Sequence, residues 1–300
     1  ELTFLLAEAQ SIKRQDKEAM ATLERALKIH KDSAKALHMM GNLHRDAGRA
    51  AEASKAYEAA FQADPAHVIS AVELAAVELL LLKGDPAKGL QAVESALTEK
   101  ALAELGPAEL ARAKVLKGVA LAAQFKLKEA EAELKEALEK DPSSLFIKAQ
   151  LARVLRANRD FAAALPLYEQ VVKEEPANIE YTEGYISSLV LLGKMVDAAK
   201  AVEAANSRFT NDARIALLYG RIDDARDQIA SAEAHYQRAL KADPNLVEAN
   251  LYLGRFYLRL RRHADARAQL EEAAKKAPAH AGLRAGLGEL GLTEKKVRLA

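Results

Sequence analysis

A skeleton of small and large residues recurs along this chain about every 34 residues. Residues 28–67 read KIHKDSAKALHMMGNLHRDAGRAAEASKAYEAAFQADPAH, and residues 241–280 read KADPNLVEANLYLGRFYLRLRRHADARAQLEEAAKKAPAH. Few residues match, yet a small residue, a later alanine, an aromatic or leucine, another alanine and a proline fall at the same intervals. A fixed period of this length is typical of stacked helical repeats, because one repeat cannot bury its apolar face alone.

The columns stay in phase across eight repeats, which we number 1 to 8. Their ranges are about 1–33, 34–67, 68–110 with an insertion, 111–144, 145–178, 179–212, 213–246 and 247–280. Position eight is small in all repeats but one: Ala7, Gly41, Ala75, Gly118, Ala152, Ile186, Gly220 and Gly254. Position twenty-four holds a larger residue: Leu23, Tyr57, Val93, Leu134, Tyr168, Val202, Tyr236 and Leu270. Composition alone does not hold several columns in register, so a generic alanine-rich bundle is disfavoured.

Each column has a physical reading. Apolar residues at helical spacing predict two amphipathic helices of about a dozen residues in each repeat. The small residues let helix axes approach closely, and the larger residue fills the space between neighbouring repeats. A proline closes five repeats, because it disfavours helix in the residue before it. Gly48 and Gly193 mark the tight turn inside a repeat, because glycine readily takes a positive φ. Pro166 falls early in a second helix, where a modest kink is tolerable.

These columns resemble the tetratricopeptide repeat family over about 280 of the 300 residues. The resemblance implies an all-α fold, a right-handed α-solenoid of stacked helix-turn-helix units over residues 1–280, with residues 281–300 as a C-terminal capping helix. The family's frequent tryptophan in the first helix is absent. Asp223 occupies position eleven of repeat 7, where an aromatic residue or leucine is expected, and puts that repeat's first helix in doubt.

The period breaks between Leu97 and Leu110, where about nine residues are added to repeat 3. We expect a lengthened second helix or a short extra turn, ended by Gly106 and Pro107. The alternative is a flexible joint between repeats 1–3 and repeats 4–8.

By resemblance to the family, certain positions of the first helices face a concave groove, and these positions vary along the chain. Repeats 3 to 5 place apolar residues there: Ile69, Val72, Ala76, Leu79, Leu80, Val115, Val119, Ala122, Ala123, Phe146 and Ala149. A contiguous exposed apolar patch usually marks a binding surface. The alternative is that the insertion at 97–110 folds back and fills this apolar trough.

Repeats 5, 7 and 8 add arginines to the groove: Arg153, Arg156, Arg214, Arg221, Arg255 and Arg259. A guanidinium binds carboxylate or phosphate in a forked geometry that lysine does not match. The alternative is an ordinary solvated face, in which these arginines pair with Glu180, Glu248, Asp223 and Asp224. Some members of the family grip a terminal carboxylate at neighbouring first helices. Here His38 and Asn42 are followed by Val72 and Ala76, so that clamp is not expected.

Charge, composition and motifs disfavour other classes of function. With 44 basic and 43 acidic residues, the net charge of +1 gives no general attraction to nucleic acid. The longest aliphatic runs are too short to insert directly in a membrane. No spacing of serine, histidine or carboxylate residues indicates a catalytic, cofactor or metal site, and we expect no enzyme. His38 and His44 lie on different helix faces, and the acidic run at Asp223, Asp224 and Asp227 is expected to be solvated.

We therefore expect a scaffold that binds a peptide, helix or protein surface, with an apolar or acidic segment favoured as the partner. By resemblance, bacterial arrays of this kind serve secretion, pilus, export or polar-complex assembly, and the residues select none of these. The alternative is a homo-oligomer formed through the end repeats. The lack of cysteine suits the cytoplasm. Because the chain starts at Glu1, we read it as a fragment or mature form, and a periplasmic or membrane-associated location stays open if a leader or anchor was removed.

Overall fold

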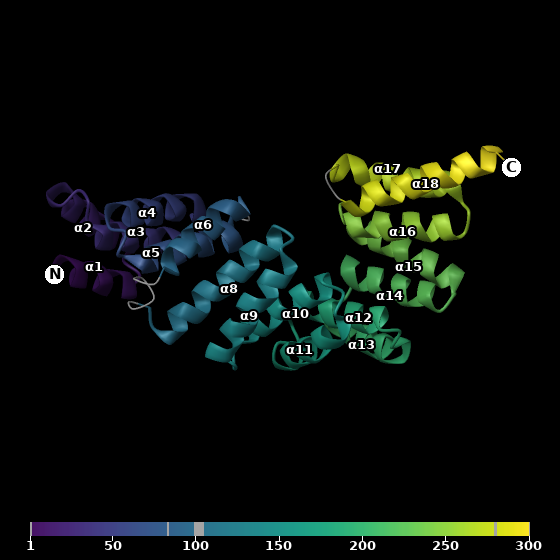
Figure 1. Ribbon diagram of the computed structural model, residues 1–300, viewed down its shortest axis with the longest axis horizontal. Helices are drawn as coiled ribbons and strands as arrows, with labels where there is room; N and C mark the ends of the chain where they lie inside the picture. Colours follow the sequence, from purple (N-terminus) through teal and green to yellow (C-terminus); the bar gives the residue numbers. More distant parts are fainter. Residues whose placement is uncertain (1, 83, 99–104, 279–280, 300) are drawn as a thin grey trace. The chain divides into compact units, whose positions relative to one another are not determined.

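The computed structural model describes residues 2–82, 84–98, 105–278 and 281–299. In these residues there are 17 α-helices, one short π-helix and no strand (Figure 1), which confirms the all-α prediction and agrees with about eight repeats. No helix of this described part combines the length and hydropathy needed to cross a bilayer. The chain divides into an N-terminal unit, Glu1–Asp160, and a C-terminal unit, Phe161–Ala300. The division falls between the two helices of repeat 5.

The N-terminal unit holds the helices of repeats 1 to 4 and the first helix of repeat 5. Their bounds are α1 Leu2–Ile12, α2 Asp16–Ile29, α3 Ala34–Asp46, α4 Ala50–Ala63, α5 Val68–Ala76, the π-helix η1 Val77–Leu81, α6 Pro86–Ala96, α8 Pro107–Ala123, α9 Leu127–Lys140 and α10 Leu145–Ala157. Each helix packs on the next one along the chain within α1 to α6, and α8 packs on α9 and α9 on α10. First helices also touch one another, α1 with α3, α5 with α8, and α8 with α10.

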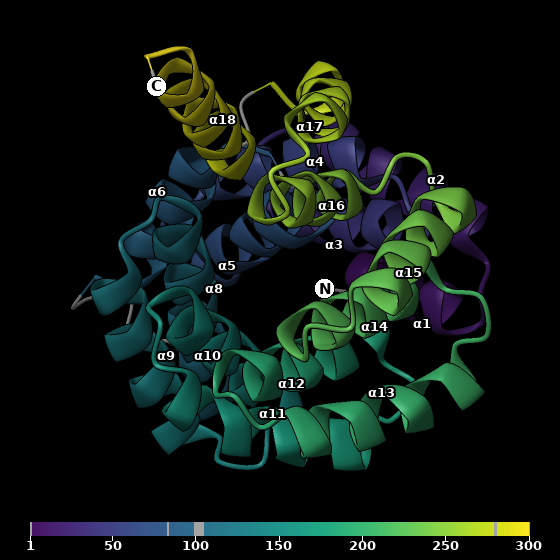
Figure 2. The ribbon, with the colours of Figure 1, turned by 90° about the vertical axis from the view of Figure 1, so that its right-hand side faces the viewer.

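The C-terminal unit follows the same scheme. Its helices are α11 Phe161–Glu174, α12 Ile179–Leu191, α13 Met195–Arg208, α14 Ala213–Ala225, α15 Ile229–Ala242, α16 Val247–Arg259, α17 His263–Lys276 and α18 Ala281–Leu299. The pairs α14–α15 and α16–α17 lie side by side (Figures 1 and 2), and α12, α14 and α16 pack in series. The helix α18 packs on α16 and α17 and buries Leu283 and Leu290.

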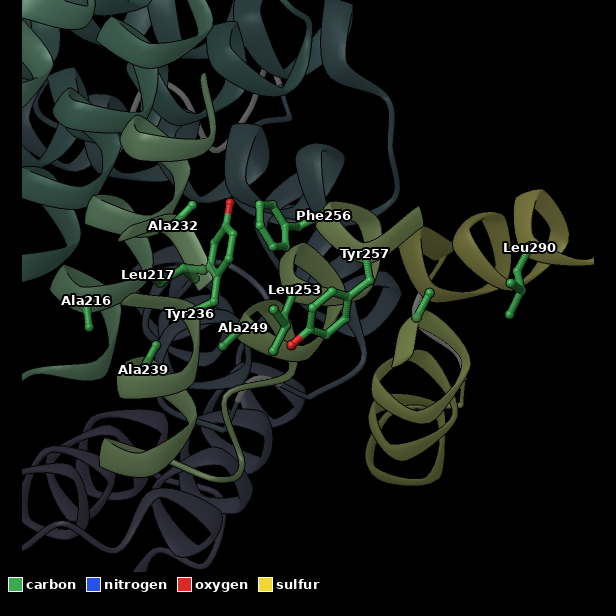
Figure 3. Packing of buried hydrophobic residues seen from close by; sticks show 11 residues of the cluster. Ala216, Leu217, Ala232, Tyr236, Ala239, Ala249, Leu253, Phe256, Tyr257 and Leu290 are labelled. Atoms are coloured by element: carbon green, nitrogen blue, oxygen red, sulfur yellow. The ribbon is translucent and has the colours of Figure 1, made fainter. Parts of the chain in front are cut away.

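Small and large residues interlock inside the repeats, as the columns predict. A Cβ atom added to Gly41 would lie 2.5 Å from the ring of Tyr57, and one added to Gly220 would lie 2.6 Å from the ring of Tyr236. In Figure 3 the ring of Tyr236 meets that of Phe256 from the next repeat, with ring centroids 5.6 Å apart in an edge-on arrangement. The position-twenty-four residue therefore joins the two helices of its own repeat and reaches the neighbouring repeat.

The turn inside a repeat uses the left-handed backbone region at position fifteen. Gly48 and Gly193 have φ angles of +72° and +73°. The same position in five other repeats has a positive φ without glycine: Arg14, Phe125, Arg159, Asp227 and Arg261. Glycine is therefore not required there, although a side chain adds strain.

Repeat 3 departs from the period in two places. The π-helix η1 takes one more residue in its turn than an α-helix does, because the amide of Leu82 donates to the carbonyl of Val77, five residues earlier, over 2.9 Å. The second helix, α6, ends at Ala96, so the prediction of a lengthened second helix is wrong. The first helix of repeat 4 is lengthened instead, because α8 begins at Pro107. Residues 99–104, where an extra turn was expected, lie outside the described residues. The helix α8 packs against both α5 and α6, and the division into units falls after Asp160.

Candidate functional site

The residues of the predicted apolar trough separate into packing residues and surface residues. Five are buried, with side chains at most 7% exposed: Val72, Ala76, Val115, Val119 and Ala149. Leu80 and Phe146 are exposed, at 37% and 40%, whereas Ile69 and Leu79 are half-buried. The positions taken to face the groove therefore also pack neighbouring first helices together, and a continuous exposed trough does not form. This is a correction to the sequence expectation.

A pocket nevertheless opens where repeats 3, 4 and 5 meet in the N-terminal unit, and we call it the repeat 3–5 pocket. It has a volume of about 440 Å³. Its lining residues come from η1, α6, α8, α9, α10 and the turn before α6: Leu79, Gly84, Pro86, Val119, Ala122, Ala123, Leu127, Arg153, Val154 and Ala157. The structure thus brings together the predicted Leu79, Val119 and Arg153. None of the described residues of segment 97–110 lines this pocket.

The two arginines of α10 differ in their surroundings. Arg153 is exposed and has no hydrogen-bond or ion-pair partner among the described residues. Arg156 is half-buried, and its buried Nε atom has no hydrogen-bond partner in the same described part. The repeat 3–5 pocket therefore combines apolar walls with an unpaired cation, Arg153.

A second pocket of the N-terminal unit is lined by residues of repeats 1 and 2 and by Ile69 of repeat 3. It has a volume of about 340 Å³ and includes Ile69 and eleven residues that were not predicted as site residues: Ala7, Glu8, Ser11, Ile12, Leu23, Lys35, His38, Met39, Asn42, Leu43 and His67. The Nδ1 atoms of His38 and His67 lie 3.0 and 2.7 Å from the hydroxyl of Ser70. Burial, and then the nearby His67, lower the pKa of His38 to about 4. His38 lies on α3 and His67 is the residue before α5, so their contact, with ring centroids 5.0 Å apart, depends on packing and had no signal in the sequence.

Three of the predicted arginines meet in a pocket of the C-terminal unit, which we call the arginine pocket. It has a volume of about 590 Å³. Its lining residues come from α12, α14, α15, α16 and the turn after α14: Val190, Leu191, Arg221, Asp224, Ala225, Asp227, Tyr236, Tyr252, Arg255 and Arg259. Arg214 is not among them; it lies in the first turn of α14, where it pairs with Asp212 over 3.3 Å.

Each arginine of the arginine pocket has a different set of partners. Arg259 is paired within the protein, with Asp224 at 2.5 Å and Asp227 at 2.9 Å. The Nη1 atom of Arg221 donates to the hydroxyl of Ser187 over 2.8 Å, and its guanidinium lies 4.7 Å from the centre of the Tyr252 ring. The solvated-face alternative therefore holds for Arg259 with Asp224, and Tyr252 is a lining residue that sequence reasoning missed.

The acidic run of repeat 7 is not uniformly solvated, which corrects a second expectation. Asp223 is only 8% exposed, and its carboxylate accepts from the hydroxyl of Ser231 at 2.5 Å and lies 2.8 Å from Nδ1 of His235. Its helix, α14, is intact because these two partners satisfy the buried charge. Ser231 and His235 both contact this carboxylate, and Oγ of Ser231 also lies 3.5 Å from Nδ1 of His235. Among the described residues, no group of three or more histidine, cysteine, aspartate or glutamate side chains is placed to hold a metal ion.

The repeat architecture is shared with known proteins. A tetratricopeptide repeat model matches residues 155–222 and 225–290, and a second model of the same description matches residues 34–67. Together these ranges cover more than half of the chain. No curated protein has a significant match to the sequence.

Solved structures of similar fold come from bacterial tetratricopeptide repeat proteins. One from Parabacteroides merdae is 17% identical, with 81% of this chain and 93% of that chain covered and a TM-score of 0.57. A thermophilic one from Thermus thermophilus is 22% identical over 61% of this chain and 99% of that chain, with a TM-score of 0.55. The C-terminal part of one from Cytophaga hutchinsonii is 15% identical over 82% of this chain and 98% of that chain, with a TM-score of 0.52.

Proposed function

Because the chain belongs to the tetratricopeptide repeat family, whose members generally mediate protein–protein interaction, we propose that it is a scaffold that binds a segment of another protein in the repeat 3–5 pocket. One observation carries this proposal. The pocket is lined mainly by apolar side chains from three successive repeats, and Arg153 stands in it without a partner among the described residues. Apolar walls with a few polar groups are typical of binding pockets in proteins.

The walls of the pocket suit an apolar side chain of a peptide or helix. Leu79, Val119 and Val154 supply aliphatic contact, and desolvating such surface gives about 25 cal/mol for each Å² buried. Arg153 would then bind a carboxylate that neighbours the apolar side chain, because a guanidinium offers paired donors to an acid. The proposed partner therefore carries an acidic residue beside a large apolar one.

A substitution that fills the pocket tests the proposal without disturbing the core. Val119 is unsuitable because it is only 7% exposed, so an acidic residue there would unfold α8. Ala157 is exposed and lines the pocket, so Ala157→Trp would occupy the space. Ala132 on α9 is also exposed and does not line the pocket, which makes Ala132→Trp a matched control.

Ligands for this test are peptides selected on the folded wild-type chain from a random-peptide phage library. We expect Ala157→Trp to lower the affinity of the chain for a selected peptide by about tenfold or more, because it blocks an anchor pocket. Ala132→Trp should leave that affinity unchanged. Circular dichroism checks that both variants fold. Equal affinities for wild type and Ala157→Trp, across all selected peptides, would remove the pocket from the account.

We further propose that the bound protein is a component of a larger bacterial assembly. The similar folds come from bacterial proteins, and the chain presents separate pockets in each unit, as a scaffold that holds more than one partner segment requires. Purification of the endogenous protein under mild conditions, followed by cross-linking through an amino acid with a photoreactive side chain at position 157, would identify that component. Cross-links that do not compete with a selected peptide would contradict the assignment.

Self-association is the second candidate function, and one observation favours it. The first helix, α1, exposes four large apolar side chains, Leu2, Leu5, Leu6 and Ile12, each more than half exposed. A second copy of the chain that covers this face would bury them. Light scattering over a hundredfold concentration range tests this candidate, together with Leu5→Glu. A constant monomer mass for the wild type excludes it, whereas a mass that grows and is reduced by Leu5→Glu supports it.

A further inference from the structure

The arginine pocket of the C-terminal unit holds two arginines, Arg221 and Arg255, that have no ion-pair partner among the described residues. We propose that Arg255 and Arg221 form a binding site for carboxylate side chains, so that the C-terminal unit recognises an acidic segment of a partner protein. The inference rests on the proposed function only in taking the partner to be a protein. Its site lies wholly in the C-terminal unit and shares no residue with the repeat 3–5 pocket.

The three arginines occupy the pocket in three different states. Arg259 has both ends of its guanidinium engaged by Asp224 and Asp227. The Nη1 atom of Arg221 donates one hydrogen bond to the hydroxyl of Ser187. Arg255 is exposed and has no hydrogen bond or ion pair among the described residues. Since a guanidinium carries five N–H donors, Arg221 and Arg255 offer most of theirs to a ligand.

The position of Arg221 is fixed before any ligand arrives. Ser187, Arg221 and Arg255 occupy position nine of three successive repeats, on α12, α14 and α16. Ser187 is buried and holds one end of the Arg221 guanidinium, while the ring of Tyr252 supports its face. An arginine that is already oriented loses less conformational entropy when it binds a carboxylate.

The acidic residues of the pocket do not compete for this site. Both Asp224 and Asp227 pair with Arg259, and the second oxygen of Asp224 also accepts from the hydroxyl of Tyr236 over 3.3 Å. The charged side chains that line the pocket are three arginines and two aspartates, which leaves an excess of positive charge. An acidic ligand complements that excess.

The apolar rim adds a condition on the partner. Leu191 is 46% exposed and lies in the pocket beside Val190, both from α12. The preferred segment therefore has acidic residues that alternate with apolar ones, so that carboxylates reach the arginines while an aliphatic side chain covers Leu191.

The test uses two fluorescein-labelled peptides with the same leucines and glycines, one with four glutamates and one with four glutamines in their place. Fluorescence anisotropy with the full chain measures both affinities at low and at moderate salt. We expect the glutamate peptide to bind at least about tenfold more tightly, because charge-assisted hydrogen bonds are the stronger kind. We also expect its affinity to fall as salt rises.

Three variants assign the effect to the site. Arg255→Gln should lower the affinity for the glutamate peptide by about tenfold. Arg255→Lys should lower it less, because lysine keeps the positive charge but lacks the paired donors of the guanidinium. Arg208→Gln is the matched control, since Arg208 is exposed on α13, outside the pocket, and the change in net charge is the same.

Several results would overturn the proposal. They are a glutamate peptide that does not bind or binds no better than the glutamine peptide, an affinity unchanged by Arg255→Gln, or equal losses in Arg255→Gln and Arg208→Gln. None of these results bears on Ala157→Trp and its selected peptides, so this inference and the proposed function fail separately.

Discussion

Gly41 on α3 lies against the ring of Tyr57 on α4, so closely that a Cβ atom on the glycine would stand 2.5 Å from Cε1 of the ring. Tyr57 is fully buried and its hydroxyl donates to Oδ1 of Asn42 over 2.7 Å, so the ring cannot move aside freely. This pairing of position eight with position twenty-four returns at Gly220 with Tyr236. It is the contact that sets how closely the two helices of a repeat approach.

Gly41→Ala is therefore expected to destabilise the protein, although alanine favours helix. Overpacking of this kind typically costs about 1–3 kcal/mol, which exceeds the gain of about 1 kcal/mol from helix propensity. Gly288 on α18 is the control, because it is exposed and a Cβ atom there meets nothing within 4 Å. Urea unfolding should show a lower midpoint for Gly41→Ala and an equal or higher one for Gly288→Ala. An equal rise for both variants would contradict the close-contact account.

The turn at position fifteen gives a prediction of opposite sign. Arg261 has a φ of +60°, where a non-glycine residue is strained. Arg261→Gly should raise the stability by up to about 1 kcal/mol, reduced by the larger entropy of glycine in the unfolded chain. Gly48→Ala is the reverse experiment, since Gly48 has a φ of +72° and open space around its Cα atom, and it should lower the midpoint. Thermal unfolding of the two variants tests the pair, and a midpoint change of the same sign in both would refute it.

The helix pairs were predictable because their signals are local and repeat eight times. Residues at positions eight and twenty-four contact each other in repeats 2, 4, 7 and 8, so one pair of columns predicts several contacts. The π-helix η1 and the long α8 were not predictable, because they depend on how one irregular repeat fits its neighbours. Asp223 shows the same limit. Its partners Ser231 and His235 come from the following helix, and only the packed structure brings them to its carboxylate.

Acid should destabilise the N-terminal unit through His38. Burial and the nearby His67 lower the pKa of His38 to about 4, against 6.5 in the unfolded chain. Between these values the unfolded state binds the extra proton, so this contribution is complete above about pH 6.5 and is lost as the pH falls toward 4. His38→Gln, which cannot be protonated in this range, should show a shallower loss of melting temperature between pH 7 and pH 5. If the melting temperatures of the wild type and His38→Gln fell in parallel between pH 7 and pH 5, the result would be inconsistent with a neutral, buried His38.

Glu73 on α5 should stabilise the fold because its carboxylate pairs with two arginines from neighbouring repeats. Its side chain is 6% exposed and pairs with Arg45 of the previous repeat at 2.9 Å and with Arg112 of the next repeat. Glu73→Gln removes both attractions, but the arginines can turn to solvent, so we expect a loss of about 1–3 kcal/mol, less than for fully buried pairs. Glu271→Gln breaks an exposed pair with Arg267 and should change the stability by less than about 0.5 kcal/mol. Similar urea midpoints for the two variants would show that Glu73 does not link the repeats.

The candidate site was predictable only in part, and the reason is geometric. Sequence position tells which residues lie near the groove, so Leu79, Arg153, Arg221 and Arg255 were all located near a pocket. It does not tell which of them is covered by the next first helix. Val72 is fully buried, although it occupies a position that was expected to face the groove.

Hydrogen exchange with and without a peptide selected on the chain tests most directly whether the surface of the first helices is the binding surface. Bound peptide should slow exchange in η1, the end of α8 and the end of α10, which carry the repeat 3–5 pocket, and Ala157→Trp should abolish that protection. Protection confined to the second helices α2 and α4, which contribute no residue to the pocket, or protection that survives Ala157→Trp unchanged, would contradict the account.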